Sequence, residues 1–317
     1  MWLFGFGRIQ LEQGPRGAPS FLRCGFELSL LRQRIGPPSV SRMISAPQTR
    51  PREPIFTMPG LVVGAIGVLI AVHALRGLLS ELTNLGLVVD FGFVPAQWSI
   101  GLGWASPDDA VSAATGGTDA AAELRGAFAR FIAEQGSLRP WTGLTYALLH
   151  GSWMHVVLNC VWLAAFATPI VRRAGPGRSL LLSAASALGG ALSHWAVHPL
   201  GVEPMIGASA VVSGLMAAAA TFVFDRSGAS YGPSPKGRGL ARIGSATRRI
   251  LRNRTALMFL GSWFVINLVF GLVATPLGVT DASIAWEAHV GGLLAGLVVF
   301  PLLDPDRPPW HDWANDA

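Results

Sequence analysis

The sequence predicts an all-α, polytopic membrane protein with six transmembrane helices. Of its 317 residues, 51% are hydrophobic and only 13% are charged, which is unusual for a soluble domain. Since a helix needs about 20 apolar residues to cross a hydrocarbon core about 30 Å thick, runs of that length mark the spans. Six such runs are present, at residues 60–79, 144–170, 180–197, 205–224, 256–276 and 284–303.

The two ends of the chain differ from this apolar middle. Residues 1–56 are basic and Pro-rich and lack a continuous apolar core, so they predict a disordered cytoplasmic tail rather than a cleaved signal peptide. We hypothesise that translation starts at Met43 or Met58. Residues 57–304 are expected to form the membrane domain, and residues 305–317 a short cytoplasmic tail.

Basic residues predict the orientation of the spans. They concentrate before the first run, between the second and third runs, and between the fourth and fifth runs. Because loops rich in Arg and Lys stay on the cytoplasmic side, both termini are predicted to be cytoplasmic. The same basic surplus is interpreted as topology and contact with the anionic lipid bilayer, not with nucleic acid. The Arg-rich, Lys-poor composition favours a bacterial inner membrane.

Two connections have a recognisable character. The long first external loop, residues 80–141, is predicted to be partly helical, because it contains an amphipathic stretch expected to lie on or in the outer leaflet. The apolar face of that stretch comprises Leu124, Ala127, Phe128, Phe131 and Ile132. Residues 225–245, rich in Gly, Ser and Pro, are interpreted as a linker.

Polar side chains inside the apolar runs mark the candidate site, because such groups are costly in a membrane. They are His150, His155 and Asn159 in the second run, Ser209 and Ser213 in the fourth, and His289 in the sixth. Counted back from the cytoplasmic span ends at 1.5 Å per residue, three of them fall roughly 6 to 8 Å below the outer edge. These three are His155, Ser209 and His289.

The residue types at this depth suit acyl transfer. A serine hydroxyl becomes a good nucleophile when a base such as imidazole takes its proton. Ser209 is also expected near the start of its helix, where free backbone N–H groups stabilise an oxyanion. His155 and Asn159, spaced i, i+4, place two further donors on one helical face.

Structural interpretations of the same residues stay open. The stripe of small residues around Ser209 is also what close helix packing requires. His150 is either a cavity wall or an interface anchor. Glu287 is not expected to complete a triad, because residues spaced i, i+2 point to different faces of a helix. The remaining residues near predicted span ends are interpreted as interface or belt residues, namely His73, His194, His198, Arg139, Trp141, Trp263 and Trp286.

Other chemistries lack their motifs. No H-E-x-x-H zinc motif is present, and Val211 stands where a hydrolase nucleophile elbow needs glycine. His155 and His289 form no more than one matched histidine pair, whereas a bis-histidine haem site of the usual transmembrane kind would need others. The sequence therefore predicts no metal, nucleotide or other cofactor.

Three motifs resemble those of the rhomboid intramembrane serine proteases. They are "HGSWMHVVLN", "GASA" and "AHVGGLLAG", in the family's order, within residues 58–303. The resemblance implies a six-helix rhomboid-like bundle that cleaves transmembrane protein substrates, with Ser209 as nucleophile and His289 as general base. His155, Asn159 and the backbone N–H of Ser209 would hold the oxyanion, and His150 would support the cavity.

Two positions depart from the family pattern. Ala210 stands where glycine often follows the nucleophile, and Ser213 stands where an aromatic residue sometimes stacks on the histidine. The alternative function is that of a rhomboid-like membrane binding or trafficking protein without catalytic activity.

Overall fold

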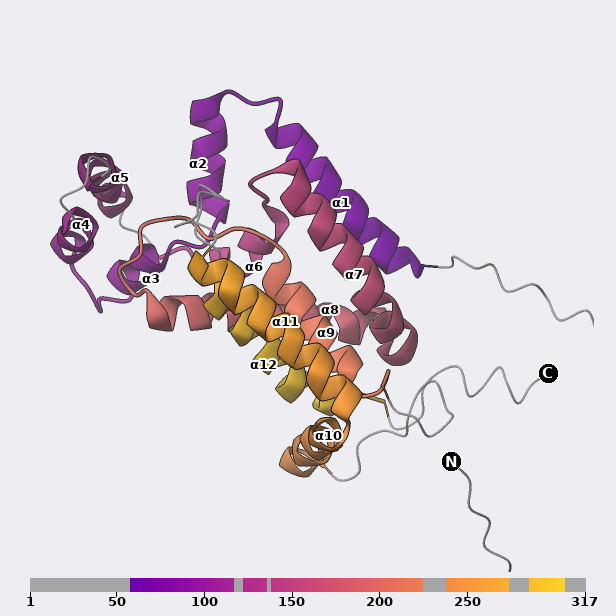
Figure 1. Cartoon of the computed structure of the whole chain (residues 1–317). Coiled ribbons are helices and arrows are strands. Elements are labelled where there is room, and N and C mark those ends of the chain that lie inside the picture. The colour runs from indigo at the N-terminus through magenta and orange to yellow at the C-terminus, as the bar shows by residue number, and fades with distance from the viewer. Residues whose placement is uncertain (1–57, 117–121, 136–137, 225–237, 274–284, 306–317) are drawn as a thin grey trace, which may run out of the picture. The chain divides into compact units, whose positions relative to one another are not determined.

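The computed structural model describes residues 58–116, 122–135, 138–224, 238–273 and 285–305, and this part of the chain is helical (Figure 1). An isolated antiparallel bridge between Phe93 and Met205 is the only β pairing among these residues. The helices are α1 (Gly60–Arg76), α2 (Glu81–Phe91), α3 (Pro95–Gly101), α4 (Pro107–Thr115), α5 (Ala122–Glu134), α6 (Thr142–Thr145), a 3-10 turn η3 (Tyr146–Leu148), α7 (Trp153–Ala174), α8 (Pro176–Val197), α9 (Ser209–Ala220), α10 (Leu240–Arg252), α11 (Arg254–Val273) and α12 (Trp286–Leu303). The terminal tails predicted at 1–56 and 305–317 lie, except for Pro305, outside the described residues.

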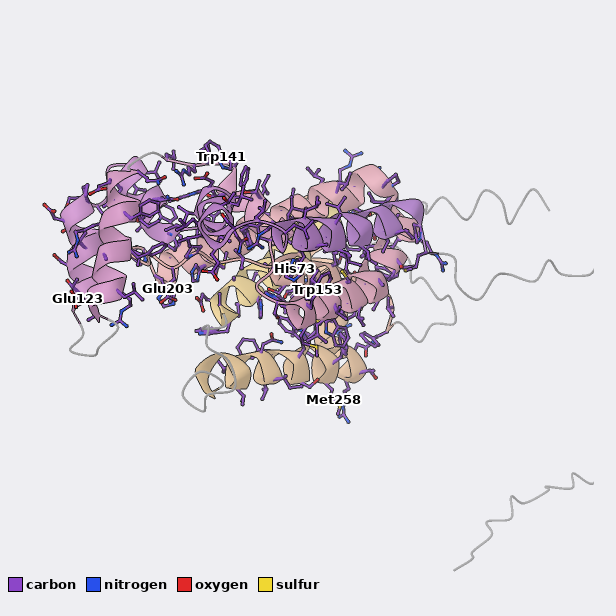
Figure 2. All side chains as sticks on the ribbon, turned by 90° about the horizontal axis from the view of Figure 1, so that it is seen from above. His73, Glu123, Trp141, Trp153, Glu203 and Met258 are labelled. Carbon is purple, nitrogen blue, oxygen red and sulfur yellow. The ribbon has the colours of Figure 1, made fainter. Side chains whose placement is uncertain are left out.

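Three of the described helices, α7, α8 and α12, are long and apolar enough to cross a bilayer. The helices α1 and α9 are shorter apolar helices, and Arg254–Val269 of α11 is a further apolar stretch. Each of the six predicted apolar runs therefore overlaps one apolar helix. The helices α1 and α7 lie side by side in space (Figure 1). His73 of α1 packs edge-on against Trp153 of α7, with ring centroids 4.7 Å apart (Figure 2).

The second run begins later than predicted. Residues 144–148 belong to α6 and η3, and α7 starts only at Trp153, where the Ser152 hydroxyl accepts a hydrogen bond from the His155 N–H and caps the helix. The apolar residues ahead of Ser152 had extended the predicted span. His150 consequently lies in the segment before α7 and not within the helix, as the sequence had suggested.

Helix α9 is short and enclosed. Every residue from Ala210 to Ala220 is buried, and the helix contacts α7, α8 and α12. Twelve residues span about 18 Å at 1.5 Å per residue, which is well short of a hydrocarbon core about 30 Å thick. A helix of this length can start below the level at which its longer neighbours end, and it starts at Ser209.

Small residues allow this close packing. A Cβ atom at Gly292 or Gly296 would collide with the backbone of Ala210 or Gly214, respectively, on α9. A Cβ atom at Gly190 of α8 would lie 2.5 Å from the Cβ atom of Ala210. The glycines of α8 and α12 thus bring three helix backbones together, as small residues do in membrane helix pairs.

A buried ion pair joins the C-terminal ends of α7 and α12. The Arg173 guanidinium donates to both carboxylate oxygens of Asp304, at 2.6 and 2.8 Å, and both side chains are almost fully buried. The Arg173 guanidinium also lies 4.5 Å above the Phe222 ring. From the neighbouring helix α10, Arg242 donates to the Asp304 carbonyl. The prediction of a linker over residues 225–245 was therefore wrong from residue 240 onward, because these residues form the start of α10 and pack against α12.

The first long loop is more helical than the sequence predicted. It contains α2 to α5, which form a second small hydrophobic cluster with Ala129 and Ile132 of α5 at its centre. The predicted apolar face of α5 is divided, because Phe128 and Ile132 pack inward whereas Leu124 and Phe131 are exposed. The prediction that this whole face of α5 contacts the membrane was therefore wrong.

Arg139, predicted to be an interface anchor, is buried beneath this loop. Its guanidinium donates to the Val89 carbonyl at 3.0 Å and to the Gln135 side chain at 2.6 Å, and it pairs with Asp90. A neighbouring hydrogen bond joins the Trp141 indole to the Asp90 carbonyl at 2.8 Å. These bonds hold the end of α2 against the segment that leads into α6.

Candidate active site

Ser209 and His289 meet between α9 and α12. The Ser209 Oγ atom lies 2.7 Å from the His289 Nε2 atom, although the two residues are 80 positions apart in the chain. His289 is buried in the first turn of α12, and Ser209 is the first residue of α9. The close approach of α9 and α12 at Gly292 makes this hydrogen bond possible.

The start of α9 presents backbone donors beside Ser209. No side chain caps this helix, so its first N–H groups retain hydrogen-bonding capacity, and the positive end of the helix dipole lies at the same point. The Ser213 hydroxyl donates to the Ser209 carbonyl at 2.6 Å and so holds the first turn. A developing negative charge next to Ser209 would be stabilised here.

His155 approaches the same point from α7. A Cβ atom placed on Gly207 would lie 2.7 Å from the His155 Nε2 atom and 3.8 Å from the Ser209 Oγ atom. The imidazole therefore faces the backbone just before the serine. Gly207 has a φ of 126°, a conformation that residues with a Cβ atom rarely adopt. Both steric reasons require glycine at this position.

Asn159 is buried one turn further along α7. Its Nδ2 atom donates to the His155 carbonyl at 3.0 Å, which leaves one of the two amide hydrogens for another acceptor. The i, i+4 spacing predicted for His155 and Asn159 is therefore realised on one helix.

His150 contacts the site from outside the helices. Its Nε2 atom accepts a long hydrogen bond, 3.4 Å, from the Ala208 N–H, and its ring lies edge-on to that of His155 with centroids 4.9 Å apart. Its carbonyl accepts a hydrogen bond from Arg76 at 3.0 Å. These contacts fit the cavity-support interpretation better than that of an interface anchor.

Glu287 does not orient His289. Its carboxylate faces His194, at 2.5 Å, and His198, at 3.2 Å, rather than His289. Within the described part of the chain, the buried His289 Nδ1 atom has no hydrogen-bond partner. Glu287 is thus not a third member of the Ser-His pair, as the sequence had predicted from the i, i+2 spacing.

Trp263 packs on His289 from α11. The two ring centroids lie 5.9 Å apart, which is within the range of aromatic contacts. The sequence had predicted Trp263 as a membrane-belt residue and had noted that Ser213 supplies no ring at the neighbouring position on α9. Trp263 provides an aromatic contact for His289 from a different helix.

Two further features of the site were not predicted from the sequence. Gly207 had been noted only as part of a motif, and its backbone conformation and contact with His155 could not be read from residue types. His194, His198 and Glu287 come together beside the site, although the histidines had been interpreted as interfacial. The i, i+4 spacing of the two histidines was the one signal that could have indicated a joint role.

The serine hydroxyl and the imidazole thus meet among packed apolar helices, at the start of α9, and three of the described helices are long and apolar enough to cross a membrane. The Rhomboid domain family matches residues 137–304, more than half of the chain. The chain therefore belongs to the rhomboid family, which confirms the family predicted from the three motifs.

The chain is also similar to a curated member of that family. It is 28% identical over 172 residues to the rhomboid protease GlpG of Pectobacterium atrosepticum, a match that covers 53% of this chain and 50% of GlpG. The chain thus spans about half of the length of this relative.

Proposed function

We propose that the protein is an intramembrane serine endopeptidase that uses Ser209 and His289 as a catalytic dyad. The observation that carries the proposal is the 2.7 Å distance between the Ser209 Oγ and His289 Nε2 atoms, from two different helices in a buried setting. Membership of the rhomboid family and similarity to a protein named as a protease support the same activity.

In this mechanism the Ser209 Oγ atom attacks the carbonyl carbon of the scissile peptide bond while the His289 Nε2 atom accepts the hydroxyl proton. The negative oxygen of the tetrahedral intermediate is held by the Ser209 N–H, His155 and Asn159. The same imidazole then gives its proton to the departing amine. Water, activated by His289, hydrolyses the acyl-enzyme and frees Ser209 for another cycle.

The substrates are transmembrane proteins whose scissile segment leaves helical form. A helical peptide carbonyl is hydrogen bonded and shielded by its own turn, so a bond inside an intact helix is a poor substrate. Gly, Pro or small polar residues near the outer end of a substrate helix weaken that helix locally, and such substrates are expected to be cleaved fastest.

The membrane arrangement proposed for the chain has six spans, formed by α1, α7, α8, α9, α11 and α12, within a domain from 57 to 304. Both termini then lie in the cytoplasm, which the basic connections favour. The composition favours the inner membrane of a bacterium. A fluorescent reporter fused to the C terminus should be active, whereas an alkaline phosphatase reporter there should be inactive.

Cleavage of a model transmembrane substrate in liposomes tests the dyad. Ser209→Ala should abolish cleavage and also abolish labelling by a serine-directed fluorophosphonate, and His289→Ala should reduce turnover nearly as far, because the two groups act as a unit. Ser183→Ala on α8 is the control, since it removes a hydroxyl that donates to the Ser179 carbonyl of its own helix, and it should retain most activity. Cleavage that persists in Ser209→Ala would refute the mechanism.

An inactive, substrate-binding rhomboid-like protein would give a different result. Wild-type protein would then bind the model substrate without cleaving it and would not react with the fluorophosphonate.

Asn159→Ala tests the oxyanion site. Its turnover should be about 10- to 1000-fold lower than that of the wild type, as expected for the loss of one oxyanion donor.

A further inference from the structure

Two histidines and a carboxylate form a cluster at one end of α8. His194 and His198 are spaced i, i+4 around the end of this helix, and Glu287 lies in the first turn of α12. The ligand atoms that they offer all lie within 4.8 Å of one another. The His194 Nδ1 atom lies 2.5 Å and the His198 Nε2 atom 3.2 Å from the same Glu287 oxygen.

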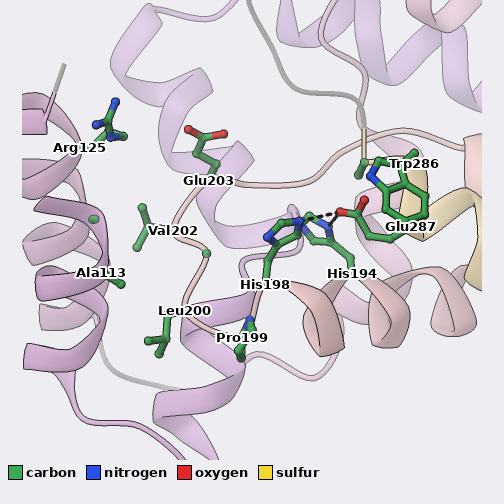
Figure 3. Close-up of a pocket in the computed structure, with 13 residues that line it drawn as sticks. Ala113, Arg125, His194, His198, Pro199, Leu200, Val202, Glu203, Trp286 and Glu287 are labelled. Atoms are coloured by element: carbon green, nitrogen blue, oxygen red, sulfur yellow. Dashed lines mark hydrogen bonds and ion pairs between the residues drawn. The ribbon is translucent and has the colours of Figure 1, made fainter. Parts of the chain in front are cut away.

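The cluster opens into a cavity of about 680 Å³ that is lined by residues of α4 and α5, the end of α8, the segment before α9 and the start of α12 (Figure 3). The Glu287 side chain is only 5% exposed, whereas that of His198 is 52% exposed. Arg125 and Glu203 line other parts of the cavity wall and do not belong to the cluster. A small solute can therefore reach the histidines, while the carboxylate lies behind them.

Two imidazole nitrogens and a carboxylate are the three protein ligands of many sites for zinc and similar ions, in which water takes the fourth coordination position. Bonds of about 2.0 to 2.2 Å in tetrahedral geometry place neighbouring ligand atoms about 3.3 to 3.6 Å apart. The His198 to Glu287 separation of 3.2 Å is close to this range. The His194 to Glu287 separation of 2.5 Å needs to widen by about 0.8 to 1.1 Å, a small rotation of either side chain.

We propose that His194, His198 and Glu287 bind one divalent transition-metal ion of the zinc type, with the remaining coordination position open to the cavity. The ion neutralises the buried carboxylate and joins the end of α8 to the start of α12. Glu287 stands two residues before His289 but points to another face of the helix, so the ion stabilises α12 without contacting the dyad. The site does not depend on the proposed protease activity.

The test uses the full chain in detergent, purified without a polyhistidine tag, stripped with chelator and carrying Ser209→Ala. Titration with Co²⁺ should produce the visible d–d absorption of a four-coordinate site, which should saturate at one ion per chain. Zn²⁺ should displace the bound Co²⁺ and so remove this absorption. Zn²⁺ should also raise the unfolding temperature. Binding and unfolding are both read without substrate, so the outcome is independent of proteolysis.

Variants separate this site from the other histidines. His198→Gln, at the most exposed ligand, should weaken Co²⁺ binding by at least about 100-fold, beyond the 10- to 100-fold typical of losing an outer-shell partner, and should remove the Zn²⁺ effect on unfolding. His194→Gln and Glu287→Gln should do the same. Glu203→Gln, in the same cavity, and the double variant His155→Ala/His289→Ala should bind as tightly as the parent.

Three results would overturn the proposal: no Co²⁺ absorption with the parent chain, undiminished absorption in His198→Gln, or its loss in His155→Ala/His289→Ala. The unfolding temperature of each variant without metal shows whether it is folded. His198→Gln remains decisive if Glu287→Gln fails to fold, because His198 is exposed.

Discussion

At the scale of single residues, Gly207 sets the relation between Ser209 and the histidine of α7. Its φ of 126° turns the chain into the start of α9, and its missing side chain leaves room for the His155 ring. A larger residue would strain the backbone and displace His155 at the same time. The oxyanion site therefore depends on a residue that carries no functional group.

Gly207→Ala should reduce cleavage of a transmembrane model substrate by at least about 100-fold, the scale of losing one oxyanion donor. Gly151→Ala is the matched control, because a Cβ atom there meets only the Ile206 Cδ1 atom at 3.8 Å, an ordinary contact. Steady-state cleavage in liposomes measures both variants. Equal activities would show that His155 does not need its present position.

At the scale of helices, small residues on α8, α9 and α12 decide how closely the backbones approach. Gly292 contacts the backbone of Ala210, next to Ser209, and lies one turn from His289. Any side chain at this position must push α12 away from α9. The distance across the dyad is thus a property of the helix pair and not of the two side chains alone.

Gly292→Ala should destabilise the protein by about 1 to 3 kcal/mol or more, as overpacking does, and should also lower turnover. Gly261→Ala on α11 is the control, since a Cβ atom there meets nothing within 4 Å. Thermal unfolding in detergent and substrate cleavage test the pair. The interpretation fails if Gly292→Ala unfolds and cleaves like Gly261→Ala.

At the scale of the whole described domain, a buried ion pair joins segments 131 residues apart. Arg173 at the end of α7 and Asp304 at the end of α12 have almost no exposed side-chain surface. A buried charge without its partner is strongly unfavourable. This pair consequently requires the ends of α7 and α12 to lie at one level.

Asp304→Asn should lower the free energy of unfolding by about 3 to 5 kcal/mol, because Arg173 keeps its charge in a buried position. Asp90→Asn should cost no more than about 1 kcal/mol, since Asp90 is half exposed and the Arg139 guanidinium keeps its hydrogen bonds to Val89 and Gln135. Replacing both members, as Arg173→Met/Asp304→Leu, should recover part of the loss. Comparable losses for the two single variants would contradict this account.

Much of this arrangement could be predicted from the amino-acid sequence. Apolar runs must be about as long as the bilayer is thick, so the positions of six apolar helices followed from hydropathy. The regular rise of a helix then placed Ser209 and His289 at a common depth, and the structure brings their side chains to 2.7 Å. Three motifs were sufficient to predict the rhomboid family.

Only the tertiary structure decided which small residues contact each other, which backbone angle Gly207 adopts, and that Trp263 lies on His289. It also decided that His194 and His198 face Glu287. The physical reason is that depth is a property of one helix, whereas rotation and neighbours depend on how several helices pack. The sequence by itself determined which groups could meet, and the packing of α8, α9 and α12 determined which of them do.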